Sequence, residues 1–397
     1  MGNVGSNDQE IEVSIVMPCL NEANSLEACI TKAQTAIREH HIAGEVVVAD
    51  NGSTDGSVEI AKKHGARVVH VALKGYGHAL REGIREARGK FIVMGDADDS
   101  YDFLEAPKFV AKWQEGYEVI MGNRYAGGIK PGAMSWSHRY IGNPVLSMML
   151  RVLFGTPFGD SHCGLRAFTK DAWNRLDLKT GAMEFASEFG IRVTQVPGLK
   201  MAEVPVALWP DKRGRPPHLH TFRDGWLNLR FMLLFAPNWL FLGPGAALMA
   251  MGLLLVVWLL PGPRWLGRVC FDVHTMFFGV LFALLGMQIL TFGLFAKVFS
   301  YTEQFDHSNR GLSRWLRQLR LETGLLAGTA LAVVGFLGDV AIFWKWKEGG
   351  FGPFSEMRWL LFWSMFFFLG VQIVFSSFLM SMLGISRGPN RGNHDIR

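Results

Sequence analysis

The most telling part of the chain is Phe91-Ile92-Val93-Met94-Gly95-Asp96-Ala97-Asp98-Asp99, where an apolar run ends abruptly in three acids. Four consecutive apolar residues followed by a glycine indicate a buried β-strand that ends in a turn. Two carboxylates separated by one residue at such a point can converge on a hard cation, Mg²⁺ or Mn²⁺, and on a diphosphate that it carries. A polar turn that caps the next helix gives the same short pattern, so the surroundings decide between the two interpretations.

Short β-rich runs alternate with helical stretches through the first half of the chain. Strands are expected at residues 13–17, 45–49, 66–71, 91–94 and 119–121. Helices are expected between them at residues 25–40, 57–64, 78–87 and 106–114. This alternation predicts an α/β fold with a mainly parallel sheet, in which ligands bind beyond the carboxyl ends of the strands.

Polar clusters follow each of the first three strands. They are Pro18-Cys19-Leu20-Asn21-Glu22, Asp50-Asn51-Gly52-Ser53-Thr54-Asp55 and Lys74-Gly75-Tyr76-Gly77-His78. The first precedes a helix N-terminus, which suits a phosphate or a ribose, and Lys74 in the third adds a positive charge. Taken alone, each of the first two clusters is more simply an ordinary capping loop, and the glycine-rich third is weak evidence.

Taken together and in this order, the four clusters resemble those of family 2 glycosyltransferases with the GT-A (Rossmann-like) fold, over residues 12–206. In that family the first two clusters hold the nucleotide of a sugar donor, and the Asp-x-Asp pair holds a divalent metal on its diphosphate. Asn51 stands where a second aspartate is common, which leaves the base open. The resemblance implies nucleotide-binding roles for Pro18, Asn21, Glu22, Asp50, Ser53 and Asp55, with Lys74 beside them, and metal ligation by Asp96 and Asp98.

Arginines recur beside small or polar residues in the rest of the first half. They lie in Gly122-Asn123-Arg124-Tyr125, in Arg139-Tyr140-Ile141-Gly142-Asn143 and in Asp160-Ser161-His162-Cys163-Gly164-Leu165-Arg166. The fork of an arginine suits phosphate oxygens, although pairing with a surface acid is an equal alternative for any one of them. The pattern, with the basic segment at 212–220, resembles the dolichyl-phosphate mannosyltransferase-like branch, whose members move one hexose onto a polyprenyl phosphate. That resemblance implies a lipid-phosphate site at Arg124, Arg139 and either Arg213 or Arg215.

The second half of the chain changes character. Four apolar runs, at 239–260, 273–295, 325–343 and 359–383, approach the roughly 20 residues that cross a bilayer, whereas soluble core helices are ordinarily shorter. The net charge of +5 reflects arginines concentrated beside these runs, which points to a membrane and away from nucleic acid. We therefore expect a GT-A domain (1–218), an interfacial helix (219–237), an all-α transmembrane domain of about four helices (238–386) and a tail (387–397), with both termini and the catalytic domain cytoplasmic.

The expected reaction is a single inverting displacement that moves one hexose from UDP-glucose or GDP-mannose to the lipid, and nothing in the sequence separates these donors. An ionised phosphate needs no strong base, so Glu184 and Glu188 have no assigned role. A processive polysaccharide synthase is one alternative, but its Gln-x-x-Arg-Trp signature is absent from the sequence. A lipid-sugar transporter is another, although the spans have few polar interruptions. The seven-residue spacing of Gly279, Gly286 and Gly293 predicts a packing seam, and self-association is an open possibility.

Overall fold

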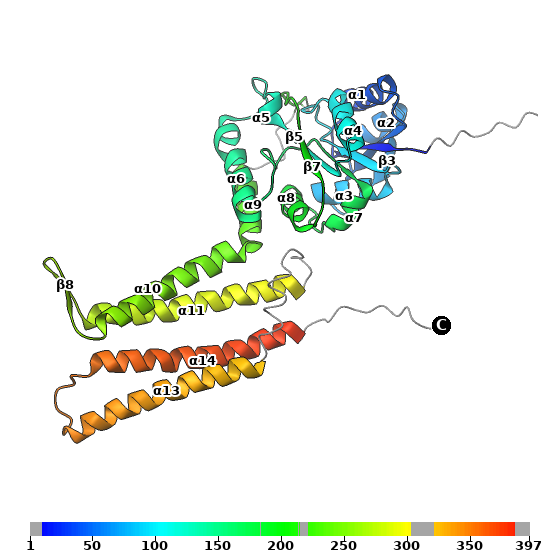
Figure 1. Cartoon of the computed structure of the whole chain (residues 1–397). Coiled ribbons are helices and arrows are strands. Elements are labelled where there is room, and N and C mark those ends of the chain that lie inside the picture. Colours follow the sequence, from blue (N-terminus) through cyan, green and yellow to red (C-terminus); the bar gives the residue numbers. More distant parts are fainter. Residues whose placement is uncertain (1–9, 183, 213, 215–220, 303–320, 386–397) are drawn as a thin grey trace, which may run out of the picture. The chain divides into compact units, whose positions relative to one another are not determined.

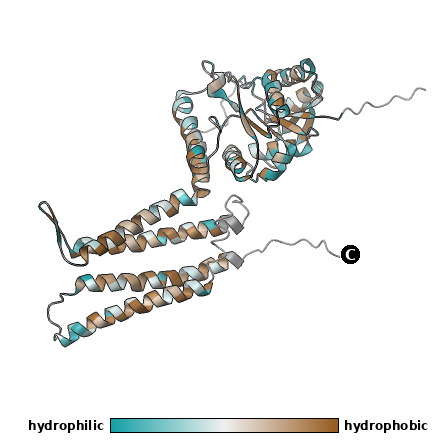
Figure 2. Cartoon of the chain, in the orientation of Figure 1, coloured by the Kyte–Doolittle hydropathy of each residue, from teal (hydrophilic) through white to brown (hydrophobic). Residues whose placement is uncertain are grey.

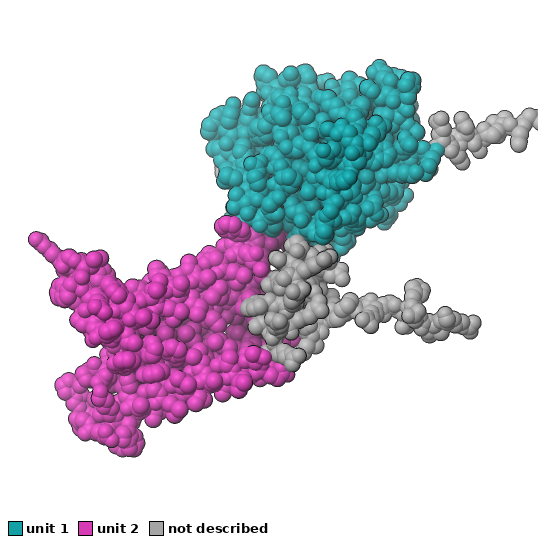
Figure 3. Space-filling model, in the orientation of Figure 1, with its two compact units in different colours: residues 1–232 teal, residues 233–397 magenta. Residues whose placement is uncertain are grey.

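The structure, a computed structural model, describes residues 10–182, 184–212, 214, 221–302 and 321–385. The chain divides into two compact units, residues 1–232 and residues 233–397 (Figure 3). The first contains a sheet with helices, and the second is built almost wholly of long helices (Figure 1).

A seven-stranded sheet forms the centre of the first unit, in the order β3-β2-β1-β4-β6-β5-β7. All five predicted strands are confirmed, and two strands that were not predicted, β6 and β7, complete the sheet. Strands β1 to β4 are parallel, whereas β6 runs antiparallel to both β4 and β5. The bounds are β1 Val13–Cys19, β2 Gly44–Asp50, β3 Arg67–His70, β4 Phe91–Met94, β5 Val119–Asn123, β6 Arg166–Thr169 and β7 Met201–Pro205.

Helices cover both faces of this sheet, because alternate residues of its buried strands are apolar on both sides. Side chains of α1, α2 and α4 share one core with the residues of β1 that include Ile15 and Met17. Side chains of α3, α7 and α8 share the other core with Val16. The helices of this unit are α1 Leu26–Glu39, α2 Ser57–Lys63, α3 Tyr76–Glu86, η1 Phe103–Glu105, α4 Ala106–Gln114, α5 Arg124–Gly127, η2 His138–Gly142, α6 Asn143–Phe154, α7 Lys170–Leu176, α8 Phe185–Gln195 and α9 Thr221–Leu234, which continues two residues past the unit boundary.

Strand pairing brings the polar clusters to one edge of the sheet. The parallel strands β1 to β4 all end there, so the acids after Met94 join the loops that follow β1 and β2. The antiparallel strand β6 begins at the same edge, because Arg166 pairs with Met94 on one side and with Met121 on the other. The segment before Arg166 therefore lies near residues 95–99, which follow β4 and are called the acidic loop below.

Four apolar helices dominate the second unit (Figure 2). The apolar segments Asn238–Leu259, Val273–Val298, Leu321–Glu348 and Met357–Leu383 have mean hydropathies of 2.0 to 2.2 and are long enough to cross a membrane. Four long apolar helices at the predicted positions are thereby confirmed. The elements are η3 Asn238–Leu242, α10 Gly243–Leu259, β8 Arg264–Leu266, β9 Val269–Phe271, α11 Val273–Thr302, α13 Leu321–Glu348 and α14 Met357–Ile385.

Glycines allow these helices to pack closely in pairs. A Cβ added to Gly286 of α11 would lie 2.4 Å from the backbone nitrogen of Met249 in α10. A Cβ added to Gly335 of α13 would lie 2.3 Å from the backbone nitrogen of Phe367 in α14. The predicted seam thus exists within the chain, between α10 and α11, and a second glycine seam joins α13 to α14.

Candidate active site

The loops after β1 and β2 are bound tightly to each other. Asn21 has a positive φ of 58°, and its backbone N–H donates to Ser53 Oγ at 2.9 Å. Its side-chain Oδ1 accepts from the Thr54 N–H at 2.8 Å, and the Ala23 N–H donates to Asp55 Oδ2 at 2.9 Å. Side chains predicted to bind the nucleotide therefore also hold the two loops together.

Asp50 and Asp55 are held in their ionised form. Burial raises the pKa of Asp50, but hydrogen bonds from Ser53 and from the Gly52 N–H outweigh this effect and leave the pKa below its ordinary value. Burial likewise raises the pKa of Asp55, while hydrogen bonds from Ser57 and from a backbone N–H bring it below the ordinary value. Both carboxylates are negative at neutral pH.

The other predicted donor-side residues lie at the same edge of the sheet. Pro18 belongs to β1 and pairs with Ala49 of β2. Glu22 is buried, and its backbone N–H donates to Ser57 Oγ at 2.9 Å. The structure brings these residues together with Asn21 and the second loop, and their contact with a nucleotide stays a prediction.

Asn51 organises the loop that carries Lys74. Its Nδ2 donates to the Leu73 carbonyl at 2.7 Å, and its Oδ1 accepts from the Gly75 N–H at 2.7 Å. Lys74 Nζ donates to the Asn51 carbonyl at 2.6 Å. Because an ionised aspartate has no donor, an acid at position 51 would lose the bond to Leu73. The departure from the family pattern therefore has a structural role here.

The two predicted metal ligands are oriented by neighbouring hydroxyls. Tyr76 OH donates to Asp96 Oδ1 at 2.9 Å. Asp98 is buried, and its Oδ1 accepts from the Ser100 N–H at 3.0 Å and from Ser100 Oγ at 2.6 Å. No group of three or more His, Cys, Asp or Glu side chains suited to a metal occurs among the described residues. Two carboxylates nevertheless fit Mg²⁺ or Mn²⁺, because Mg²⁺ commonly binds through one or two protein carboxylates together with substrate phosphates.

The segment before β6 packs directly against these acids. The Gly164 N–H donates to Tyr101 OH at 2.8 Å, and a Cβ added to Gly164 would lie 2.5 Å from Asp96 Oδ2. Arg166 is almost fully buried, and its Nε and Nη2 donate to the Cys163 carbonyl at 3.1 and 2.7 Å. A side chain at 164 would displace Asp96 or Tyr101, because an added Cβ would lie within 3 Å of both.

Arg124 forms a buried ion pair with Asp160. Its Nε lies 2.6 Å from Asp160 Oδ2 and its Nη2 lies 2.7 Å from Asp160 Oδ1, and both side chains are buried. The Arg124 N–H also donates to Asp160 Oδ2 at 3.1 Å. The prediction that Arg124 contacts a lipid phosphate remains untested, and its fork already holds a carboxylate within the protein.

Arg139 has a different environment. It is half-buried in η2, its Cζ lies 5.4 Å from the centre of the Tyr140 ring, and no carboxylate of the described residues forms an ion pair with it. Its carbonyl accepts from Tyr125 OH at 3.0 Å, which links η2 to α5. The other predicted acceptor residues, Arg213 and Arg215, lie outside the described residues.

Glu188 has a structural role that the sequence left open. Its buried carboxylate accepts from the Lys179 N–H at 3.0 Å and from the Thr180 N–H and Oγ1 at 2.8 and 2.6 Å. The N-cap of α8 is Glu184, which makes no side-chain capping bond. Glu188 therefore holds the loop before α8.

His162 joins the segment before β6 to α9. Burial and the positive charges of Arg124 and Arg166 lower the pKa of His162 to about 4, so the ring is neutral at pH 7. Its Nε2 lies 3.4 Å from Ser187 Oγ, which donates to Asn228 Oδ1 at 2.6 Å. The helix predicted to be interfacial is thus hydrogen-bonded to the α/β unit.

Sequence reasoning missed the partners of the predicted residues. Tyr76 and Asp160 lie in stretches recognised as site clusters, but neither was assigned a role, and Tyr101 was not considered. The sequence offered only local cues to these residues, such as a tyrosine between two glycines. Local cues do not reveal distant partners, and Asp160 lies 36 residues from Arg124.

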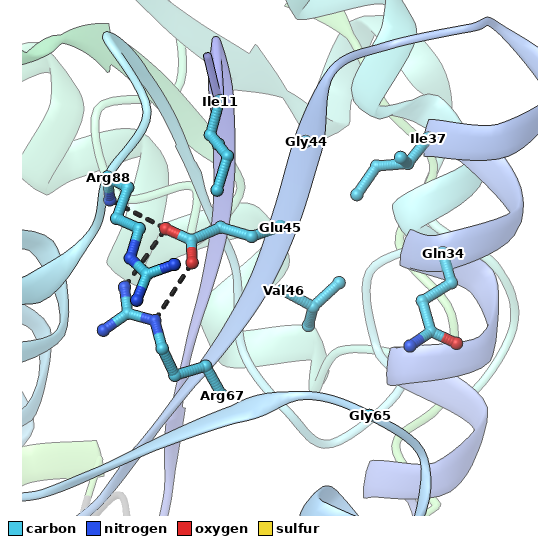
Figure 4. A pocket seen from close by; sticks show the side chains of 9 residues that line it. All are labelled: Ile11, Gln34, Ile37, Gly44, Glu45, Val46, Gly65, Arg67 and Arg88. Carbon is cyan, nitrogen blue, oxygen red and sulfur yellow. Dashed lines mark hydrogen bonds and ion pairs between the residues drawn. The ribbon is translucent and has the colours of Figure 1, made fainter. Parts of the chain in front are cut away.

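A separate cavity of about 380 Å³ lies at the opposite edge of the sheet, where β2 and β3 begin (Figure 4). Within it Glu45 accepts two hydrogen bonds from Arg67, at 3.0 and 3.1 Å. None of the predicted site residues lines this cavity, which is bounded by Ile11, Gln34, Ile37, Gly44, Glu45, Val46, Gly65, Arg67 and Arg88.

Comparisons with known proteins define the class. Residues 14–176 match the family described as Glycosyl transferase family 2, and residues 294–384 match the glycosyltransferase family 2 C-terminal transmembrane region. With the GT-A architecture and the four apolar helices, these matches describe a membrane glycosyltransferase.

Individual relatives agree with this class over most of their length. The low-salt glycan biosynthesis hexosyltransferase Agl6 of Haloferax volcanii is 36% identical over 374 residues, which cover 94% of this chain and 89% of the relative. Glycosyltransferase AglJ of the same organism is 30% identical over 296 residues, covering 72% and 93%. An undecaprenyl-phosphate 4-deoxy-4-formamido-L-arabinose transferase of Serratia proteamaculans is 26% identical over 302 residues, covering 72% and 87%. The chain belongs to glycosyltransferase family 2, which confirms the resemblance drawn from its motifs.

Proposed function

We propose that this enzyme transfers one hexose from a nucleotide sugar, UDP-glucose or GDP-mannose, to a polyprenyl phosphate at the membrane, with inversion at the anomeric carbon. The observation that carries the proposal is the contact between Gly164 and Asp96. Through it, the acids that suit a donor diphosphate adjoin the segment whose Asp160 holds Arg124. A relative that acts on undecaprenyl phosphate supports the choice of acceptor.

A divalent cation held by Asp96 and Asp98 would neutralise negative charge that develops on the departing nucleoside diphosphate. The chain's own residues prepare that position, because Tyr76 and Ser100 fix the two carboxylates before any substrate arrives. Preorganised groups of this kind avoid reorganisation during the reaction.

The acceptor supplies its own nucleophile. A lipid phosphate is ionised at neutral pH, so one of its oxygens attacks the anomeric carbon without first losing a proton to a base. The engagement of Glu188 with backbone amides agrees with this reaction, since a base is not needed. Positioning and charge then remain as the main tasks of the protein.

The end of η2 and helix α6, which follow Arg139, expose an apolar face that could contact lipid. Ile141, Val145, Met148 and Val152 are 41 to 55% exposed, and their spacing of four, three and four residues places them on one helical face. An exposed apolar stripe beside basic residues is typical of helices that lie in the bilayer interface. We propose that this face, together with α9, contacts the cytoplasmic leaflet, and that the two termini and the catalytic unit are cytoplasmic.

Direct assay tests this function. Purified protein in detergent is incubated with Mn²⁺, a radiolabelled nucleotide sugar and either undecaprenyl or dolichyl phosphate. We expect label in a chloroform-soluble product that mild acid releases, at one hexose per lipid. A product that grows to a polymer, or the absence of any lipid product across a panel of UDP and GDP sugars, would contradict the proposal.

Replacing Arg139 by alanine is expected to raise the KM for the polyprenyl phosphate by about tenfold to a hundredfold, because a hydrogen bond to a charged group contributes roughly 1.5 to 3 kcal/mol. The KM for the nucleotide sugar should change less than twofold. Steady-state kinetics with each substrate varied in turn measure both values. Arg85→Ala removes an exposed arginine of α3 that pairs with Glu82, and it serves as a matched control. An equal rise in both KM values for Arg139→Ala would contradict an acceptor role.

A further inference from the structure

The third acid of the opening stretch, Asp99, pairs with two lysines. It has a positive φ of 61°, and its side chain is 1% exposed. Lys32 Nζ of α1 lies 2.8 Å from Asp99 Oδ1, and Lys212 Nζ lies 2.7 Å from Asp99 Oδ2. Both carboxylate oxygens thus lie in ion pairs, and the contact of Oδ2 with Lys212 is one of charge alone, without the geometry of a hydrogen bond.

The segment 208–212 lies along the acidic loop as a short antiparallel ribbon. Tyr101 and Leu208 form an antiparallel bridge, and the Trp209 N–H donates to the Ser100 carbonyl at 2.9 Å. The Lys212 N–H donates to the Asp98 carbonyl at 3.0 Å. The backbone of Lys212 therefore touches the residue that would hold the metal, while its side chain binds the next acid in the sequence.

Lys212 is also the last residue before the predicted acceptor arginines, Arg213 and Arg215. Its side chain and its backbone N–H both bind the acidic loop that follows β4. Lys212, the start of the basic segment, is therefore attached to the acidic loop through both its backbone and its side chain.

We propose that the ion pair between Asp99 and Lys212 acts as a latch, which holds the start of the basic segment against the acidic loop. The latch thereby sets the position of the lipid phosphate relative to the donor diphosphate. Both are positioning residues and neither touches substrate. The proposal rests on the proposed function for its kinetic consequence, but the latch itself is a property of the α/β unit. Lys32 balances the charge of Asp99 from α1 and has no link to the basic segment.

The variants that test the latch are chosen to keep the local backbone. Asp99→Asn keeps a residue type that tolerates positive φ while removing the charge, and Lys212→Met removes the ammonium from a side chain that is 65% exposed. The matched controls are Asp102→Asn, whose amide can still cap η1, and Lys32→Met, which removes the other ammonium.

Hydrogen–deuterium exchange on the full chain in detergent tests the latch without any substrate. We expect the amides of Trp209 and Lys212 to exchange about threefold to fivefold faster in Asp99→Asn and Lys212→Met, because the ribbon loses an ion pair whose lysine is exposed, and to be unchanged in both controls. Unchanged exchange in Lys212→Met, or equally faster exchange in Lys32→Met, would overturn the latch. This result stands whether or not the wild-type protein charges a lipid.

Kinetics test the positioning role. Asp99→Asn and Lys212→Met are expected to raise the KM for the polyprenyl phosphate about fivefold to tenfold, with the KM for the nucleotide sugar and the Kd for UDP with Mn²⁺ within twofold of wild type. The double variant should resemble either single variant, because both remove one interaction. Additive effects, or equal changes in both KM values, would refute positioning even with the exchange result intact. A wild-type protein that makes no lipid product refutes the proposed function instead.

Discussion

Replacing Asp98 by asparagine is expected to reduce sugar transfer by about a hundredfold to a thousandfold, the usual loss when one preorganised group that stabilises developing charge is removed. Asparagine keeps an oxygen that can accept from the Ser100 N–H and Oγ, so the turn should persist. What is lost is the negative charge that would hold the cation. Initial rates at saturating donor and lipid, with Mg²⁺ or Mn²⁺ present, measure the effect.

The control for this prediction is Asp102→Asn, an equivalent change four residues along the same loop. Asp102 caps η1 through the Leu104 N–H, and asparagine caps helices about as well. Turnover of the Asp98→Asn variant within tenfold of wild type, at an unchanged melting temperature, would remove Asp98 from the metal site.

The largest stability effect is expected from Asp160→Ala. Removing one partner of a buried ion pair costs about 3 to 5 kcal/mol, because Arg124 is left charged and buried. For a unit of this size the melting temperature should fall by about 6 to 20 °C. Cys19, Cys29 and Cys163 are buried in the α/β unit, so a thiol-reactive dye reports its unfolding in the full chain.

Two further variants separate the buried pair from a general effect of charge. Glu118→Gln breaks a partly exposed pair with Arg175 but keeps an oxygen that can accept from the Lys200 N–H, so it should cost no more than about 1 kcal/mol. Arg124→Met combined with Asp160→Leu should recover much of the lost stability, because an apolar pair of similar volume leaves no buried charge. A fall of less than 2 °C for Asp160→Ala would show that Arg124 finds another partner, and would favour its direct role toward phosphate.

Local patterns in the sequence predicted most of the elements. Short runs of three to six residues, rich in apolar and β-branched side chains, located β1 to β5, because buried strands are mostly apolar on both faces. The two missed strands, β6 and β7, contain Arg166, Glu203 and Pro205, which are unusual in strands. Their assignment depends on distant partners that no local pattern contains.

The residues of the candidate site also fall into those that local patterns predicted and those that they did not. The acids and arginines were found because polar residues gather where apolar strands stop. Their partners were not found, because Asp160 lies 36 residues from Arg124, and Lys212 lies 113 residues from Asp99. Such pairs form only when the sheet brings the ends of its strands together.

The sequence by itself determined the family, the order of the first five strands and of the four helices between them, the four apolar helices and the identity of the acids at the end of β4. The family rests on the resemblance of the motifs, and the rest follows from periodicity, length and residue type, all of which are local. Only the tertiary structure decided the antiparallel direction of β6, the commitment of Arg124 to Asp160, the role of Glu188 and the pairing of Asp99 with Lys212. A buried charge must find a counter-charge, and the three-dimensional path of the chain selects which one it meets.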